Sequence, residues 1–395
     1  MVRNGGGGEC VREFMAGIYL HVPFCKQACH YCDFHFSTNT RHRAAMVATL
    51  AKELVLRGDY LGEETVQTIY LGGGTPSLLT VAELQLLLAT VYQHYPVTAQ
   101  PEVTLEANPD DLNPVKLKEL REVGINRLSI GIQSFHEPHL RYLNRAHRAG
   151  EATRCVQQAQ EVGFDNLSID LIYAIPADDH RVWKRDLAQA IALQPQHISS
   201  YCLTIEEKTV FGRWQQQGRL RAVSDAFAAE QFELLLTTLT AAGFDPYEVS
   251  NFCQPGYYAR HNTSYWQNQK YLGIGPSAHS YDGVSRQHNV ANNVKYLKAL
   301  VGEVIPFERE ELSRYDQINE RVMTGLRTKW GCDLEELKNR FQYDLYQEHA
   351  AYISQLIGEG KAVLQENQLI LTNSGRLMAD GIAEAFFLID TEYND

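Results

Sequence analysis

The chain has 395 residues, and its 36 Lys and Arg against 48 Asp and Glu give a formal net charge of −12. This acidic excess repels phosphate backbones and argues against nucleic-acid binding. Hydrophobic residues make up 44% and charged residues 21%, as in ordinary globular proteins, so a disordered or fibrous chain is excluded.

The N-terminal residues 1–16 contain no apolar segment that would make a signal peptide, and we expect a flexible tail there. Met15, directly before the first apolar run, is a second candidate translation start. No stretch reaches the ~18 continuous apolar residues that a membrane helix needs. Eight cysteines are too few for a disulfide framework in a chain of this length, so we expect reduced thiols and a cytoplasmic location.

Short β-branched runs alternate with amphipathic segments over 17–221. The predicted strands are 18–22, 68–71, 102–106, 127–132, 166–172 and 197–201, and the predicted helices are 43–61, 81–94, 114–123, 150–162 and 179–193. This alternation predicts a parallel α/β sheet with right-handed crossovers. Six such units are too few for a closed eight-stranded barrel, which leaves a partial barrel or a doubly wound sheet.

The pattern changes at about residue 222. A helix to 242, a strand 245–249 and an aromatic, Gly-rich stretch form a predicted linking region, 222–308. The C-terminal unit, 309–395, has predicted helices 313–327, 334–341 and 345–359, a hairpin 362–365/368–371 and a last helix after Thr372. Helices followed by a hairpin predict a winged-helix-like domain. Its acidic composition disfavours DNA binding and favours a role in covering or packing.

Polar residues gather where the predicted strands end. Gly-Gly-Gly-Thr-Pro (72–76) follows the second strand, Glu106 closes the third, Gln133 follows the fourth, and Asp170 lies late in the fifth. Because ligand sites of parallel α/β proteins lie at the carboxyl ends of the strands, we expect these groups to meet at one site.

Cys25, Cys29 and Cys32 lie in the loop after the first strand, four and then three residues apart. Thiolates with this spacing can hold an iron–sulfur cluster and leave one iron without a protein ligand. The alternatives are simple core cysteines or a structural zinc site, which needs a fourth ligand such as His21, His30 or His35. We interpret the remaining cysteines as buried or incidental thiols: Cys10, Cys155, Cys202, Cys253 and Cys332.

The Cys-x3-Cys-x2-Cys spacing, with Tyr31 before the third cysteine and the Gly-rich segment after the second strand, resembles the radical S-adenosylmethionine (SAM) superfamily. The resemblance implies a partial (β/α)6 TIM-like barrel, a 4Fe-4S cluster on the three cysteines and SAM on the open iron. The segments Leu-Glu-Ala-Asn-Pro (105–109), Arg-Leu-Ser-Ile-Gly-Ile-Gln-Ser (127–134) and Ile-Asp-Leu-Ile-Tyr (169–173) resemble the branch of oxygen-independent coproporphyrinogen III oxidases and HemW-type heme chaperones, over roughly 17–390. The SAM-site residues it implies are Tyr19, Tyr31, Gly73, Gly74, Thr75, Glu106, Gln133, Arg145 and Asp170.

Two features favour the chaperone group over the oxidases. The oxidase motif continues with a fourth cysteine, where this chain has Phe34. The segment His261-Asn-Thr-Ser-Tyr-Trp266 is similar to the chaperones' His-Asn-x-x-Tyr-Trp signature, which implies heme contact by His261, Tyr265 and Trp266, with His279 as a second ligand candidate. The alternative interpretation is a structural loop whose aromatic residues form core and whose histidine bonds a backbone carbonyl.

The resemblance therefore implies a chaperone that binds a 4Fe-4S cluster, SAM and heme. It would deliver heme to acceptor hemoproteins of respiration, including membrane-associated ones, and need an electron donor for the cluster. The alternative is the oxidase, which decarboxylates coproporphyrinogen III through a 5′-deoxyadenosyl radical; whether the chain is an enzyme depends on this choice. A third class is a zinc-stabilised α/β protein that binds no SAM.

One further departure is Tyr173-Ala-Ile-Pro-Ala177, where relatives carry glycine at both alanine positions. Since alanine tolerates positive φ poorly, we expect the turn there to differ.

Overall fold

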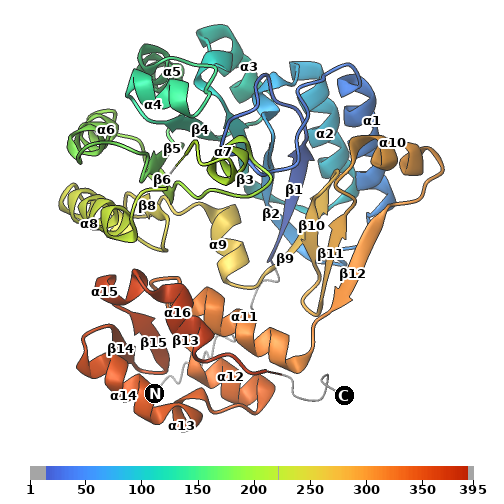
Figure 1. The fold of residues 1–395 in the computed structure, drawn as a ribbon. Coiled ribbons are helices and arrows are strands. Elements are labelled where there is room, and N and C mark those ends of the chain that lie inside the picture. The colour runs from blue at the N-terminus through green and yellow to red at the C-terminus, as the bar shows by residue number, and fades with distance from the viewer. Residues whose placement is uncertain (1–14, 221, 390–395) are drawn as a thin grey trace, which may run out of the picture.

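A computed structural model of the protein describes residues 15–220 and 222–389. Within this part of the chain, twelve strands form one sheet in the order β12-β11-β10-β9-β1-β2-β3-β4-β5-β6-β8-β7 (Figure 1). The first six are parallel neighbours in chain order: β1 Met15–Val22, β2 Thr65–Gly73, β3 Val97–Ala107, β4 Arg127–Gln133, β5 Leu167–Tyr173 and β6 His197–Cys202. All six predicted strands are thus confirmed. The first begins earlier than expected, since Met15 and Ala16 belong to it, whereas residues 1–14, with Cys10, lie outside the described residues.

Helices surround these strands on their outer side (Figure 1). The segments between β1 and β7 are α1 Arg43–Leu56, the 3-10 turns η1 Pro76–Leu78 and η2 Pro109–Asp111, α2 Val81–His94, α3 Pro114–Glu122, α4 Glu137–Tyr142, α5 Ala149–Val162, α6 Arg181–Ala192, α7 Val210–Gln216 and α8 Asp225–Ala241. Local sequence accounts for the best-predicted boundaries. Thr80 and Glu83 form a capping box at the start of α2, and Asn113 caps α3 before Pro114. Helices α4 and α7 were not predicted.

The predicted linking region extends the sheet at both edges, beyond β1 and beyond β6. It comprises β7 Asp245–Pro246, β8 Asn251–Cys253, α9 Arg260–Trp266, β9 Lys270–Ile274, β10 His279–Tyr281, β11 Ser285–Asn289, α10 Asn293–Val301 and β12 Phe307–Glu311. β9 pairs parallel to β1, and β10 to β12 add antiparallel strands. Phe232, Leu235 and Leu272 share one buried core with the barrel strands, so the packing runs across the predicted boundary at residue 221.

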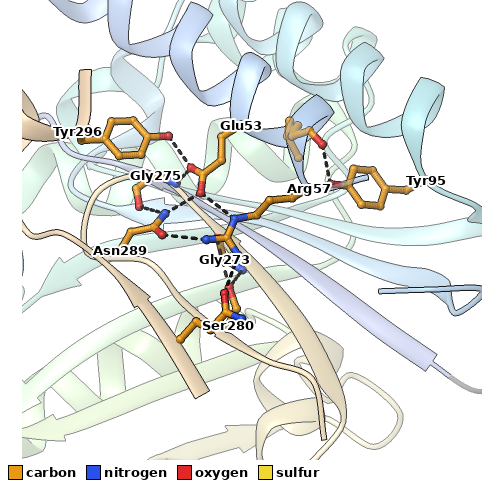
Figure 2. A network of polar contacts seen from close by, with 10 residues as sticks. Glu53, Arg57, Tyr95, Gly273, Gly275, Ser280, Asn289 and Tyr296 are labelled. Carbon is orange, nitrogen blue, oxygen red and sulfur yellow. Dashed lines mark hydrogen bonds and ion pairs between the residues drawn. The ribbon is translucent and has the colours of Figure 1, made fainter. Parts of the chain in front are cut away.

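A buried polar network fastens this extension to α1 (Figure 2). Glu53 accepts hydrogen bonds from Arg57 Nε (3.0 Å), Asn289 Nδ2 (2.7 Å) and Gly275 N (2.8 Å), and from the hydroxyl of Tyr296. Arg57 also donates to Asn289 Oδ1 at 3.0 Å. Because buried charges are stable only when paired and hydrogen-bonded, this network holds α1, β11 and α10 in one arrangement.

The C-terminal unit has its own buried core, which includes Ile318, Leu337, Ile353 and Phe386. Its elements are α11 Arg314–Leu326, β13 Cys332–Asp333, α12 Leu334–Phe341, α13 Leu345–Glu348, α14 Ala350–Gly358, β14 Ala362–Gln365, β15 Gln368–Leu371, α15 Asn373–Arg376 and α16 Ala379–Glu384. The helices and the β14–β15 hairpin match the winged-helix-like expectation. The domain boundaries themselves stay predictions. No helix of the described residues has the length and apolarity needed to cross a membrane.

Three sequence-based expectations were wrong in detail. The predicted strand 245–249 ends at Pro246, and the chain then turns back into β8. The buried Tyr247 lies in this turn, and its hydroxyl forms a hydrogen bond of 2.7 Å with His197 Nε2. The predicted helix 345–359 is broken at His349, whose ring contacts the Tyr343 hydroxyl at 3.1 Å. The last predicted helix divides at Met378, where φ is −119°.

Candidate functional site

A cavity of about 430 Å³ lies at the carboxyl ends of β2 to β6. Side chains from all five strands line it, which requires the sheet to curve around the cavity as in a partial barrel. The predicted metal and cofactor residues that line it are Cys25, Cys29, Tyr31, Cys32, Gly73, Gly74, Thr75, Glu106, Gln133, Arg145 and Asp170. Those that do not line it are Tyr19, His261, Tyr265 and Trp266.

The cysteine loop is held in place by the segment after α4. Gln27 Nε2 donates to Asn144 Oδ1 at 2.8 Å, and Asn144 Nδ2 donates to the Ala28 carbonyl at 2.8 Å. His30 Nδ1 donates to the Tyr142 carbonyl at 2.9 Å. The helix that sequence reasoning missed therefore orients the three cysteines toward the cavity.

Arg145 follows the same segment and reaches the centre of the site. Its NH1 group donates to Cys29 Sγ at 3.3 Å, and its NH2 group donates to Asn108 Oδ1 at 2.6 Å and to the Gly131 carbonyl at 2.8 Å. A guanidinium beside a sulfur stabilises the thiolate, which is the form that binds metal. Its Nε is buried and has no hydrogen-bond partner among the described residues.

Burial shifts the protonation of the thiols. It raises the pKa of Cys25, and it raises the pKa of Cys32 to about 12. Metal binding must therefore displace protons from this site. Three half-buried thiols that face one cavity, with a cation beside one of them, fit an iron–sulfur cluster held on one side by protein.

The zinc alternative needs a histidine as fourth ligand. In the described chain, each of the three candidates already uses a ring nitrogen elsewhere: His21 with the His35 carbonyl (2.8 Å), His30 as above, and His35 with Asn293 Oδ1 (2.7 Å). Nor do three or more His, Cys, Asp or Glu side chains of the described residues form a group suited to a single metal ion.

Two carboxylates lie buried in the cavity wall. Glu106 accepts from the Tyr70 hydroxyl at 2.8 Å and from Gly73 N at 3.2 Å, and Asp170 accepts from Ser129 Oγ at 3.1 Å. Burial raises the pKa of Glu106 to about 7 and that of Asp170 to about 6. Neither forms an ion pair within the described residues. Because a buried carboxylate ionises readily only beside positive charge, this wall fits a cationic ligand such as SAM.

The Gly-rich segment has a structural reason for its glycines. Gly73 has φ of +100°, and a Cβ atom there would lie 2.4 Å from His21 Nδ1; one on Gly74 would lie 2.6 Å from the Phe24 carbonyl oxygen. Gly74 N and Thr75 N donate to the Val22 and Phe24 carbonyls. Since the segment's N–H groups are used within the protein, its carbonyl oxygens are what it offers to an ammonium group.

Gln133 is directed into the cavity by an irregularity in β4. The pairing of β4 with β5 shifts between Gly131 and Gln133, and Gln133 has a left-handed φ of 68°. Such a bulge re-aims a side chain, and positive φ in a non-glycine residue is a strain often found at functional sites. A Cβ on Gly131 would lie 2.9 Å from Gln133 Nε2, so a side chain there would displace the end of Gln133 from its present position.

The His-Asn-x-x-Tyr-Trp segment forms helix α9, and its histidine is buried. His261 is 1% exposed; Nδ1 bonds Thr68 Oγ1 at 2.7 Å and Nε2 bonds the Tyr265 hydroxyl at 2.8 Å. Its backbone N donates to Glu102 Oε1 at 3.0 Å, and burial lowers its pKa to about 3. Both ring nitrogens of His261 are bonded to hydroxyls, so ligation of a heme iron would require one of these hydrogen bonds to break, and heme contact by this segment stays a prediction.

Other predicted residues also lie apart from the cavity. Tyr19 is covered by Tyr70, with ring centroids 6.0 Å apart, so it supports the wall rather than lining it. Trp266 lies under the Arg327 guanidinium of the C-terminal unit, 5.5 Å from Cζ to the ring centre. His279 is exposed on β10 and stacks on His288 at 5.5 Å.

Several lining residues were not predicted: Tyr70, Asn108, Asn262, Tyr201 and Cys202. Asn108 and Asn262 belong to motifs already singled out: Asn108 is two residues after Glu106, and Asn262 directly follows His261. Successive side chains of a strand point to opposite faces, and this alternation could have placed Tyr70 and Tyr201 on the face toward the cavity. Cys202, taken above for an incidental thiol, is half-buried at the cavity, whereas Cys155, Cys253 and Cys332 are buried as expected.

Comparison with known proteins decides the family. Residues 19–186 match the Radical SAM superfamily model, and residues 312–378 match the HemN C-terminal domain model. Over 375 residues the chain is 32% identical to "Heme chaperone HemW" of Bacillus subtilis, covering 94% of this chain and 99% of that protein. The chain belongs to the HemW heme chaperone family. The HemW of Escherichia coli is 39% identical over 265 residues, which cover 66% of this chain and 69% of that protein.

A solved structure of coproporphyrinogen III oxidase (HemN) from Escherichia coli has the same fold as this HemW-family chain. The TM-score is 0.81, with 95% of this chain and 90% of that chain covered. Sequence identity is 22%, so this likeness establishes the fold alone, in agreement with the partial barrel that the family resemblance implied.

Proposed function

We propose that the protein binds a 4Fe-4S cluster through Cys25, Cys29 and Cys32, binds SAM beside it, and carries heme to acceptor hemoproteins. The observation that carries the proposal is the single cavity into which the three cysteines, Arg145 and two buried carboxylates all face. The named function of the relatives at 32–39% identity supports the heme part.

A cluster held by the three cysteines would leave one iron without a protein ligand, and that iron would be available to SAM. The chain's own residues do the rest. Glu106 and Asp170 would balance the positive charge of SAM, the carbonyls of the Gly-rich segment would accept from its ammonium group, and Gln133 would offer both a donor and an acceptor to SAM. Arg145 would hold Cys29 in place through the hydrogen bond from its NH1 group to Sγ.

Two partners complete the proposal: a reductant that supplies an electron to the cluster, and acceptor hemoproteins of respiration, including membrane-associated ones. The mouth of the cavity presents Phe34, 68% exposed, and Tyr201, 44% exposed. Exposed aromatic side chains at the mouth of a ligand cavity are suited to contact with a partner or a large ligand.

The cluster is tested by anaerobic purification. We expect iron and sulfide each near four per chain, and loss of most of both in Cys29→Ser, with Cys253→Ser as the matched control because Cys253 is buried away from the cavity. Stoichiometric zinc in place of iron would refute the proposal.

A turnover assay distinguishes the chaperone function from the oxidase function. With SAM, reductant and coproporphyrinogen III under anaerobic conditions, we expect no protoporphyrinogen IX, whereas a hemin-loaded sample should transfer heme to an apo-hemoprotein acceptor. Sustained decarboxylation would establish the oxidase instead.

A further inference from the structure

Arg127, the first residue of β4, carries a positive charge deep inside the barrel. It is 1% exposed, and among the described residues its Nε has no hydrogen-bond partner and its guanidinium pairs with no carboxylate. By contrast, the buried Arg57 pairs with Glu53 at 3.0 Å. Because a buried charge is costly unless it is paired, the burial of Arg127 requires a reason other than packing.

The alternation of β4 places Arg127 on the face of the strand that lines the cluster cavity. Ser129, Gly131 and Gln133 all line that cavity. Since successive side chains of a strand point to opposite faces, Arg127 also points inward, one step below Ser129. Opposite it on β3 is Thr104, whose buried Oγ1 likewise has no partner among the described residues. Arg127 therefore lies beneath the floor of the cavity.

Glu106 and Asp170 are the carboxylates directly above Arg127. Glu106 lies opposite Ser129 in the pairing of β3 with β4, and Asp170 accepts from Ser129 Oγ at 3.1 Å. One inward step along a strand is two residues, a rise of about 7 Å, which is too far for an ion pair but close enough for a strong electrostatic effect. Burial raises the pKa of both carboxyls, and the positive charge of Arg127 acts on both in the opposite direction.

The other charged groups nearby have partners of their own. Arg145 also faces Asp170, but it donates to Cys29 Sγ, and Glu102 on β3 accepts from the backbone N of His261. Burial keeps the remaining titratable groups around Arg127 and the two carboxyls neutral at pH 7, since it raises the pKa of the tyrosines and of the thiol and lowers that of the histidines: Tyr19, Tyr70, Tyr201, Tyr265, Cys25, His197 and His261.

We propose that Arg127 is a positioning residue of the cluster cavity: its buried charge keeps Glu106 and Asp170 ionised, so that a cationic ligand meets carboxylates and not carboxylic acids. This inference rests on the proposed function, because SAM is the cation that it concerns. Arginine is always protonated in proteins. A unit charge about 10 Å away, in a medium of effective dielectric constant ~20, shifts the pKa of a carboxyl by about one unit.

The test compares SAM binding at pH 9 and pH 7 by the full chain with its cluster reconstituted. With the pKa of Glu106 at about 7 and that of Asp170 at about 6, protonation of the two carboxyls should lower the wild-type affinity about twofold between these pH values. In Arg127→Met and Arg127→Gln both pKa values should be about one unit higher, and the loss should reach about twentyfold. In Arg127→Met/Glu106→Gln it should return to about twofold.

The ratio between the two pH values isolates the effect of charge. A purely structural role of Arg127 would weaken SAM binding by the same factor at both pH values, and titration of the SAM amino group is common to all variants. A second readout needs no SAM: at pH 8, infrared spectra of the ligand-free protein should show several times more protonated Glu106 and Asp170 in Arg127→Met than in the wild type. Most of this excess should be absent from Arg127→Met/Glu106→Gln.

The matched control is Arg321→Met, which removes another buried arginine, 7% exposed, from α11 of the C-terminal unit and should leave the loss at about twofold. Equal losses in the wild type and in Arg127→Met, or a twentyfold loss that persists in Arg127→Met/Glu106→Gln, would overturn the inference while SAM binding itself stands. If the wild-type protein binds no SAM at pH 9, the proposed function fails, and the infrared comparison still decides the role of Arg127.

Discussion

Lowering the pH from about 8 to about 6 is expected to weaken SAM binding about twentyfold, because it protonates the two buried carboxylates that face the ligand. The pKa of Glu106 is raised to about 7 and that of Asp170 to about 6, in both cases chiefly by burial. If only the ionised pair binds the cation, protonation of Glu106 contributes about tenfold over this range and protonation of Asp170 about twofold.

The assay is equilibrium binding of SAM to the cluster-loaded protein at several pH values, with the visible absorbance of the cluster as a check on its integrity. Glu106→Gln keeps the shape of the side chain and removes the titrating group, so its affinity should change only about twofold over the same range. An affinity that is constant in the wild-type protein, or a twentyfold change that persists in Glu106→Gln, would refute the reasoning.

The same pKa values fix the sign of their effect on stability. Since the pKa values of both carboxyls are raised in the folded protein, these groups contribute fully to the free energy of unfolding below the ordinary carboxyl pKa. This contribution is lost as the pH rises toward 7. Bound SAM brings positive charge to the pair, so we expect the ligand to stabilise the protein more at neutral pH than at acidic pH.

Three further predictions concern stability, each followed by urea unfolding. Glu53→Leu leaves the Arg57 guanidinium buried without its partner and should lower the free energy of unfolding by about 3–5 kcal/mol. Adding Arg57→Met should recover part of this loss. A loss below about 1 kcal/mol would contradict the role given to the network. Ala174→Gly should raise the free energy of unfolding by about 1 kcal/mol, because Ala174 has φ of 60°, and a decrease would show that this strain is absent. His261→Ala should cost about 2–4 kcal/mol without any heme present, and a neutral effect would mean that its two hydrogen bonds hold nothing in place.

The fold was predictable because its signals are local. The alternation of strands and helices gave six parallel strands, and the capping residues Thr80 and Asn113 placed the starts of α2 and α3 correctly. The predicted strand 245–249 and helix 345–359 failed for the opposite reason. Tyr247 and His349 are drawn to partners elsewhere in the fold, and such contacts leave no periodic mark on the sequence.

The residues of the candidate site likewise divide into those that local sequence could predict and those that it could not. Residues at strand ends, such as Glu106 and Asp170, could be assigned from position alone, since parallel strands bring their carboxyl ends together. Arg145 lies outside any strand end, and only the resemblance pointed to it. The burial of His261 depends on Thr68 and Glu102 from two other strands, which no spacing within its own motif reveals. The turn at Ala174 keeps positive φ despite its alanine, held by a 2.7 Å hydrogen bond from its N–H to Gln231 Oε1.

Helix α9 is fixed at its start by the Glu102 carboxylate, which accepts from His261 N. Asn262 of this helix lines the cluster cavity, whereas His261 beside it bonds Thr68 Oγ1 and the Tyr265 hydroxyl on the buried side. A ligand that displaced Asn262 would therefore strain the hydrogen bonds of His261, and by thermodynamic linkage a variant that loosens those bonds would change the affinity for that ligand.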